Sequence, residues 1–253
     1  MTRWLPAERL APIIAGIAGL VWIWMELAPV RTGYADTDNP AMGLSFLNAD
    51  PLAWPLAGLA AGIASVALVA TVLAMRVRLA PASSNGGAPS VGVDTIAVIG
   101  IMAAACLFGM AAVRMSGGPI RYVQGLDQDW GEAAYLVTQF VGTQALATGG
   151  LVLLALWLGS VAWMGARRGV IPRAVALLAV LPVLRLVGVL GPFGIEAEGV
   201  WLLLVLAIPA AFAWLVLLGA TIRRPEGMTA ADILASSAAT RDGGGGHLGE
   251  ASA

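Results

Sequence analysis

Six long apolar runs constrain this chain more than any other feature, because each is long enough to cross a bilayer core of about 30 Å as a helix. The runs cover about residues 11–30, 52–75, 95–113, 132–166, 173–190 and 199–222. Hydrophobic residues make up 59% of the 253 residues and charged residues only 11%, unlike an ordinary soluble domain. The sequence therefore predicts an all-α fold, a polytopic transmembrane helical bundle with six spans.

The predicted membrane domain covers residues 1–225. Residues 226–253 are expected to form a disordered cytoplasmic tail, because the chain becomes polar and rich in glycine there. The alternative for the first apolar run is a cleaved signal peptide, which the length of the run and the presence of Glu26 both disfavour. We therefore treat that run as a retained span.

Arginines gather on one side of the predicted bundle. The richer side holds Arg3, Arg9, Arg76, Arg78, Arg167, Arg168, Arg173, Arg223, Arg224 and Arg241, and the other side Arg31, Arg114 and Arg121. Cytoplasmic loops of membrane proteins carry an excess of basic residues, so this bias places the richer side in the cytoplasm. Both termini are expected on that side, as an even number of spans requires.

Several residue types that common chemistry needs are absent or lie far from the bundle. The sequence contains no lysine, which excludes a P-loop lysine and a Schiff base of lysine with pyridoxal phosphate or retinal. His247, the only histidine, lies in the tail, and Cys106, the only cysteine, lies in an apolar run, so neither a bis-histidine haem nor an intrachain disulfide can form. The charges form no basic stripe that would bind nucleic acid. We expect no enzyme activity, no cofactor and no nucleic-acid partner.

Polar residues inside the apolar runs are the strongest functional signal, since an ionisable group at depth costs at least about 2.5 kcal/mol and normally has a partner. Glu132, Gln139 and Thr143 share one face of the fourth run on an ideal helix. Arg185 and Glu26 lie at matching depths, about six and about five residues from the outer ends of their runs. We predict that Arg185, Glu26 and Gln139 converge near the outer surface, with Glu132 and Thr143 on the same polar stripe.

Two interpretations of this predicted cluster are open. In the first, a buried ion pair fixes the register of the helices and binds no ligand, and the protein is structural or regulatory. In the second, Arg185 is the fixed charge of a pocket for a small polar or anionic solute, as in a transporter or receptor. The first is slightly favoured, because polar contacts between helices are common packing devices in membranes.

Two weaker patterns have ordinary explanations. Asp127, Asp129 and Glu132 resemble part of a calcium loop, but the full spacing is absent and acidic residues are common in outward loops, so no metal site is predicted. Gly58 and Gly62 form a GxxxG pattern, which permits close approach of helices. Packing within the chain is the favoured use of these glycines. The alternative is a homo-oligomer or another membrane partner, in addition to the lipid bilayer itself.

Several stretches of the sequence carry a resemblance to a known family. They are GYADTDNP at 33–40, GLDQDWGEAAYLVTQ at 125–139, LPVLRL at 181–186, and GPFG with GVWLLL at 191–204. With these stretches the chain resembles an uncharacterised bacterial family of six-span integral membrane proteins, a domain of unknown function. The resemblance implies six helices in the bacterial inner (cytoplasmic) membrane. It supplies no reaction, ligand or catalytic residue.

Overall fold

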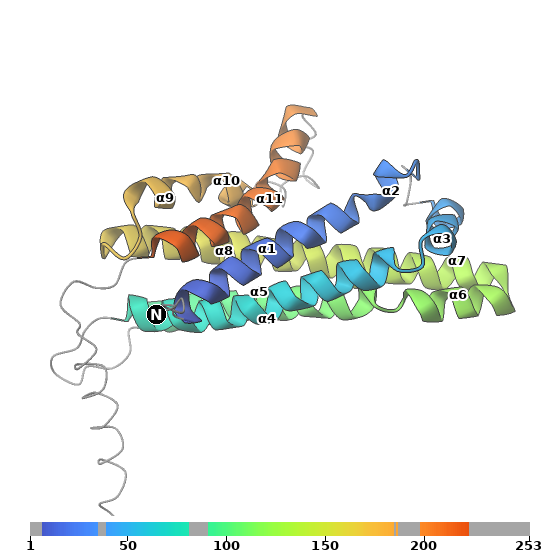
Figure 1. Cartoon of the computed structure of the whole chain (residues 1–253), viewed down its shortest axis with the longest axis horizontal. Helices are drawn as coiled ribbons and strands as arrows, with labels where there is room; N and C mark the ends of the chain where they lie inside the picture. Colours follow the sequence, from blue (N-terminus) through green and yellow to red (C-terminus); the bar gives the residue numbers. More distant parts are fainter. Residues whose placement is uncertain (1–6, 35–38, 81–90, 185, 187–197, 223–253) are drawn as a thin grey trace, which may run out of the picture. The chain divides into compact units, whose positions relative to one another are not determined.

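The computed structural model describes residues 7–34, 39–80, 91–184, 186 and 198–222. Every regular element in these ranges is a helix, which confirms the all-α prediction. The elements are α1 (Ala7–Glu26), α2 (Ala28–Arg31), α3 (Pro40–Ala49), α4 (Ala53–Leu79), α5 (Val91–Arg114), α6 (Gly117–Leu126), α7 (Gln128–Leu136), the π-helix η1 (Val137–Ala145), α8 (Leu146–Arg167), α9 (Arg173–Leu178), α10 (Val180–Val183) and α11 (Glu198–Thr221). They belong to one compact unit, Met1–Ile222 (Figure 1). The expected tail at 226–253 lies outside the described residues.

Four helical segments are long and apolar enough to cross a membrane, judged by length and composition. They are Glu8–Glu26, Ala53–Leu79, Val91–Leu126 and Gln128–Arg167, and they contain the first four predicted spans almost entirely. The regions of the fifth and sixth predicted spans contain the shorter apolar helices Arg173–Val183 and Leu206–Thr221. The structure therefore supports four spans, and the count of six stays a prediction.

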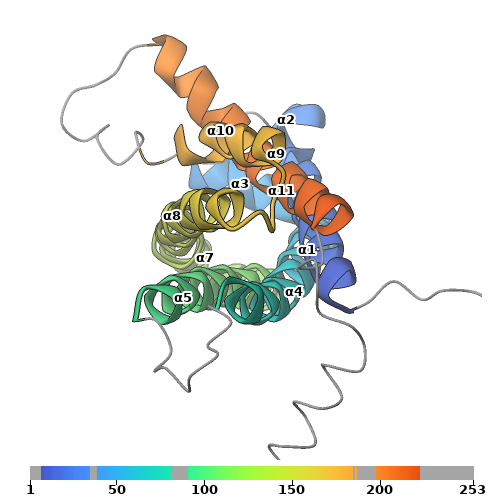
Figure 2. The same cartoon turned by 90° about the vertical axis from the view of Figure 1, so that its left-hand side faces the viewer.

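The long helices form a ring, each packed mainly against its two neighbours (Figure 2). α4 packs against α1 and α5, while α5 also contacts α8 and α1 also contacts α11. α9 and α10 lie against α8 and α11 and complete the ring. Large buried side chains fill it, including Trp157, Phe212 and Trp214. The indole nitrogen of Trp214 donates a hydrogen bond of 2.7 Å to the carbonyl oxygen of Val175, which joins α11 to α9.

Glycines allow some of these helices to approach closely. A Cβ atom added to Gly58 on α4 would lie 2.7 Å from the carbonyl oxygen of Ala111 on α5. One added to Gly16 on α1 would lie 2.5 Å from the carbonyl oxygen of Phe212 on α11. Gly58 is therefore used for packing within the chain. Gly62, the other half of the GxxxG pattern, makes only ordinary van der Waals contacts on the same face.

A second, smaller core lies beyond one end of the ring, and the short helices α2, α3, α6 and α7 form most of it (Figure 1). We call these four helices the cap. The buried residues of this core are Ala28, Leu44, Phe46, Leu47, Ala53, Trp54, Ile120 and Tyr135. Asn39 caps α3 by accepting a hydrogen bond of 3.0 Å from the Ala41 amide, and Pro40 opens the helix. Residues 40–49 and 117–126, which lie between the predicted spans, are thus helices that bury one face.

Charged residues lie at two levels of the ring. At one level Arg78 pairs with Glu8, and Arg76 pairs with Asp94 at 2.6 Å. At the other level Arg114 pairs with Glu26 at 2.6 Å. At 1.5 Å per residue, the levels are about 27 Å apart along α1 and about 30 Å apart along α5. This separation matches the thickness of one hydrocarbon core.

Candidate functional site

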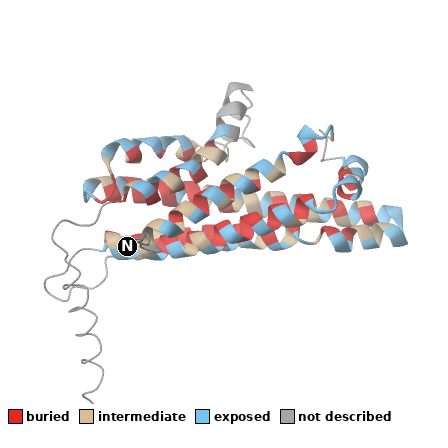
Figure 3. Cartoon of the chain, in the orientation of Figure 1, coloured by how far each residue is buried: buried red, intermediate tan, exposed pale blue. Residues whose placement is uncertain are grey.

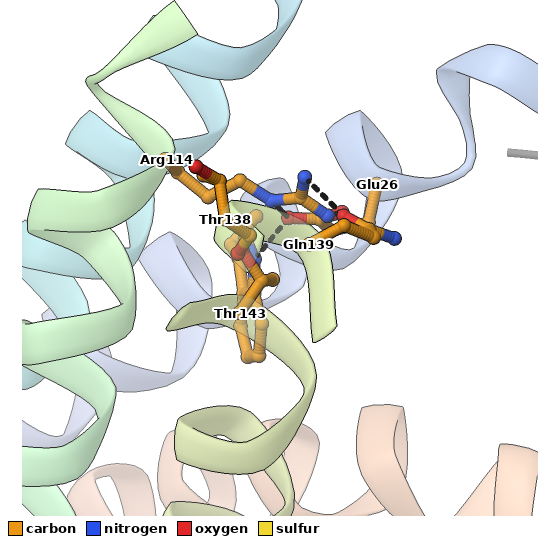
Figure 4. A network of polar contacts seen from close by, with 6 residues as sticks. Glu26, Arg114, Thr138, Gln139 and Thr143 are labelled. Atoms are coloured by element: carbon orange, nitrogen blue, oxygen red, sulfur yellow. Dashed lines mark hydrogen bonds and ion pairs between the residues drawn. The ribbon is translucent and has the colours of Figure 1, made fainter. Parts of the chain in front are cut away.

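An ion pair between Arg114 and Glu26 forms the centre of the candidate site (Figure 4). Arg114 is the last residue of α5 and is only 5% exposed. Its Nε donates to Oε1 of Glu26 at 2.9 Å and its Nη2 donates to Oε2 at 2.6 Å. Such two-pronged, charge-assisted hydrogen bonds are among the strongest polar contacts in proteins. The carboxylate of Glu26 therefore neutralises the buried guanidinium.

Two further side chains hold the Arg114 guanidinium. Nη1 of Arg114 donates to Oε1 of Gln139 at 3.0 Å, and the guanidinium carbon lies 4.3 Å from the centre of the Trp54 ring. The carboxylate of Glu26 has a second donor as well, because Nε1 of Trp22 lies 3.0 Å from its Oε1. Carboxylate, amide and aromatic face together replace the water that a buried cation loses. We call Glu26, Arg114 and Gln139 the Arg114 cluster.

Tyr135 connects the cluster to the cap. Its ring stacks on Trp54 with centroids 5.5 Å apart and an angle of 23° between the planes. The Tyr135 ring also fills the space beside Gly43 of α3, where any Cβ atom would overlap it. Tyr135 is fully buried. Through Tyr135, the cap therefore packs directly against α4 of the ring.

The π-helix η1 positions Gln139 (Figure 4). Its nine residues contain wider turns than an α-helix, and the Thr143 hydroxyl donates 3.1 Å to the carbonyl oxygen of Thr138, five residues earlier. Tyr135, Gln139 and Thr143 are all buried along this stretch. Short π-helical segments occur frequently at functional sites because they redirect side chains within a helix. Here the redirected side chain is the amide that binds Arg114.

A small cavity of about 80 Å³ adjoins the Arg114 cluster. Its lining consists of Met25, Glu26, Pro29, Phe46, Trp54, Ala57, Arg114, Tyr135 and Gln139. A single water needs about 10–15 Å³ of such space, so the cavity holds a few waters or one small ion. Pockets for drug-sized organic ligands measure about 300–1,000 Å³. The cavity is too small for a sugar or a nucleotide.

The structure brings together only some of the residues predicted to form the cluster. Glu26 and Gln139 meet on Arg114, whereas Thr143 is buried on the same stripe and bonds within η1. Glu132 is partly exposed, and its carboxylate accepts a hydrogen bond of 3.3 Å from Gln128, away from the ion pair. The hydrogen bond of Glu132 therefore lies within α7 and not at the ion pair. Arg185 lies outside the described residues.

Arg114, the cation of the observed cluster, was not among the predicted site residues. The sequence interpretation placed it at the outer exit of the third span, where an arginine normally meets water. One feature of the sequence could have indicated the pair: α1 ends at an acidic residue, Glu26, and α5 ends at a basic residue, Arg114. Because the cap covers this level of the ring, the arginine is buried rather than solvated.

The acidic residues at the start of α7 have a structural use. Oδ1 of Asp127 accepts a hydrogen bond of 3.0 Å from the Trp130 amide and caps the helix. Within the described ranges, no group of three or more histidine, cysteine, aspartate or glutamate side chains is arranged to hold a metal ion. The weak metal candidates Asp127, Asp129 and Glu132 therefore do not form such a group.

Comparison with known proteins identifies no relative. No family model, no curated protein and no solved structure matches the chain. The resemblance to a six-span bacterial family consequently stays a prediction, and the function has to be argued from the geometry of the chain.

Proposed function

We propose that this chain is an integral membrane protein with a structural or regulatory role, in which the Arg114 cluster fastens the helices of a membrane-embedded ring to one another where the ring meets the cap. The outward faces of the long helices support the membrane location, because large apolar side chains there are exposed (Figure 3). Ile17, Leu59, Val66, Val98 and Trp163 are each more than half exposed. A soluble protein rarely exposes apolar surface on so many faces, whereas acyl chains would cover it.

The proposed location is the bacterial inner membrane, crossed several times, with both termini in the cytoplasm. The ion pairs of Arg76 and Arg78 support this orientation, since they bring the end of α4 to the starts of α5 and α1. The end of the ring that holds Arg76 and Arg78 is therefore also where α1 begins, and the positive-inside rule assigns an arginine-rich end to the cytoplasm. The proposed fifth span, about residues 173–190, contains α9 and α10, and the proposed sixth span, about residues 199–222, contains most of α11.

The orientation can be tested with single cysteines in a Cys106→Ala background expressed in bacteria. We expect Ser45→Cys, on the exposed side of α3, to react with a membrane-impermeant maleimide in intact cells. Val91→Cys, exposed at the opposite end of the ring, should react only after the cells are permeabilised. Reversed labelling would reverse the orientation, and equal labelling of both sites in intact cells would contradict a membrane-spanning ring.

One observation carries the structural role: the guanidinium of Arg114 is bonded to two side chains and stacked on a third, beside a cavity of only about 80 Å³. These contacts come from α1, α4, α5 and η1, so the cluster ties four separate elements where the cap begins. Removing one member of a buried ion pair leaves the charge of its partner uncompensated, and the folded protein is then strongly destabilised. The pair therefore holds the helices that carry it in one arrangement.

The second candidate function is a receptor or transporter for a small polar or anionic solute. Its support is the polar cavity itself and the exposure of the Glu26 side chain, which is 26% exposed. A solute carboxylate would have to displace Glu26 from Arg114, because both anions need the same two guanidinium donors. The size of the cavity limits this candidate to very small solutes.

A thermal-unfolding screen of the detergent-purified protein separates the two candidates. We expect no shift of Tm for the parent with chloride, formate, acetate or phosphate, and a lowered Tm for Glu26→Gln without ligand. If a solute at 100 times its Kd raises the stability of the parent by about 2.7 kcal/mol, the receptor candidate is correct. In that case Arg114→Gln should abolish the shift.

A further inference from the structure

The turn between α8 and α9 carries positive charge that no acidic side chain compensates among the described residues. Arg167, Arg168 and Arg173 lie within this short turn and are all exposed. The ion pairs in the described ranges use other arginines, including Arg76 and Arg78 at the same end of the ring. The turn is therefore a local concentration of unpaired cations rather than part of a network of ion pairs.

An aromatic and apolar stripe runs down α8 from this turn. The guanidinium of Arg167 lies 4.2 Å from the centre of the Trp163 ring, and Trp163 is 62% exposed. Leu156, Ser160, Trp163 and Arg167 share one face of the helix at its normal period, and Leu156 is also exposed. A cation, an interfacial tryptophan and an apolar surface thus follow one another along the helix, as at the edge of a bilayer.

α9 and α10 form a second exposed apolar surface next to this stripe. The helices α9 and α10 begin at Arg173 and expose Leu177, Val180 and Leu181. α10 lies directly against α8, because a Cβ atom added to Gly159 would lie 2.9 Å from a Val183 methyl group. Gly159 borders the exposed stripe of α8. The two apolar surfaces are therefore neighbours, and both end at arginines.

We propose that this turn binds the phosphate of an anionic phospholipid, whose acyl chains lie along Trp163, Leu177 and Leu181. Arginine suits this ligand because its planar guanidinium donates two parallel hydrogen bonds to phosphate oxygens. The apolar surfaces below the arginines select a lipid over a free phosphate, which gains nothing from them. The inference depends on the proposed membrane location and is independent of the role of the Arg114 cluster.

Native mass spectrometry of the detergent-solubilised full chain tests the proposal. The protein is mixed with phosphatidylglycerol and phosphatidylcholine of identical acyl chains, and the lipids retained on it are counted. A basic residue near a membrane surface strengthens anionic lipid binding about fivefold, so we expect the preference for phosphatidylglycerol to fall by on the order of 100-fold in Arg167→Gln/Arg168→Gln/Arg173→Gln. High salt should weaken binding to the parent.

The matched control removes cations from the opposite end of the ring. Arg31 stacks on Trp24 at 4.0 Å, as Arg167 stacks on Trp163, so Arg31→Gln/Arg121→Gln removes an equivalent arginine–tryptophan pair. This control should keep the lipid preference.

Three results would overturn the inference: equal binding of the two lipids, an undiminished preference in the triple variant, or full competition by soluble glycerol phosphate. Recovery of the chain in the soluble fraction without detergent would instead refute the membrane location.

Discussion

Replacing Arg114 with methionine is expected to lower the free energy of unfolding by about 3 kcal/mol, toward the low end of the range for breaking a buried ion pair. The substitution leaves the Glu26 carboxylate and the Gln139 amide without their shared donor, although the partial exposure of Glu26 moderates the cost. Methionine retains most of the apolar stem of Arg114 while it removes the charged guanidinium that stacks on Trp54. Equilibrium unfolding in detergent measures the loss, and tryptophan fluorescence should report it locally, since Trp22 and Trp54 both contact the cluster.

The control for this prediction is the double variant Glu26→Gln/Arg114→Met. A neutral glutamine needs less compensation than a carboxylate, so the double variant should be more stable than Arg114→Met alone. The two single variants and the double variant form a thermodynamic cycle that isolates the coupling between the two side chains. An Arg114→Met protein whose stability lies within about 0.5 kcal/mol of the parent would disprove the proposed locking role.

Gly58→Ala is expected to destabilise the ring by about 1–3 kcal/mol, whereas Gly62→Ala should be nearly neutral. The added methyl group at Gly58 would lie 2.7 Å from a backbone oxygen of α5, which cannot move without shifting the whole helix. At Gly62 the closest atom is the flexible end of Met115, at 3.8 Å. The same unfolding measurement applied to both variants compares one chemical change at two neighbouring sites on α4.

The oligomeric state of these glycine variants gives a separate readout. Light scattering in detergent should show the same mass for the parent and for folded Gly58→Ala, because Gly58 packs inside the chain. A change of mass without a change in unfolding would favour the alternative role of the GxxxG pattern, contact with another copy of the chain.

The sequence predicted the long helices well because apolar length and helical period are local properties. It also placed Glu26 and Gln139 at compatible depths, and in the structure both side chains bind Arg114. It could not supply Arg114, since the burial of that residue depends on a cap formed by distant segments. A helical face also shows only which residues align and not which of them a neighbour covers, so it could not show that Glu132 accepts a hydrogen bond within α7.

The cap was missed for a different reason. α3 and α6 are only ten residues each, and α6 contains three glycines, so their stability comes from tertiary burial of Phe46 and Ile120. One available signal was overlooked: Asn39 followed by Pro40 is typical of a helix start. The six predicted spans accordingly contain no helix in the segments that follow the first and third spans.

The π-helical segment makes the polar contact depend on chain length as well as on residue identity. Deleting one exposed residue such as Val141 would restore the ordinary α-helical period, and each residue on its N-terminal side would then turn by about 100° relative to α8. Gln139 would leave Arg114 and Tyr135 would leave Trp54, although neither side chain had been altered. Insertions and deletions in this stretch should therefore be far less tolerated than substitutions at its exposed positions.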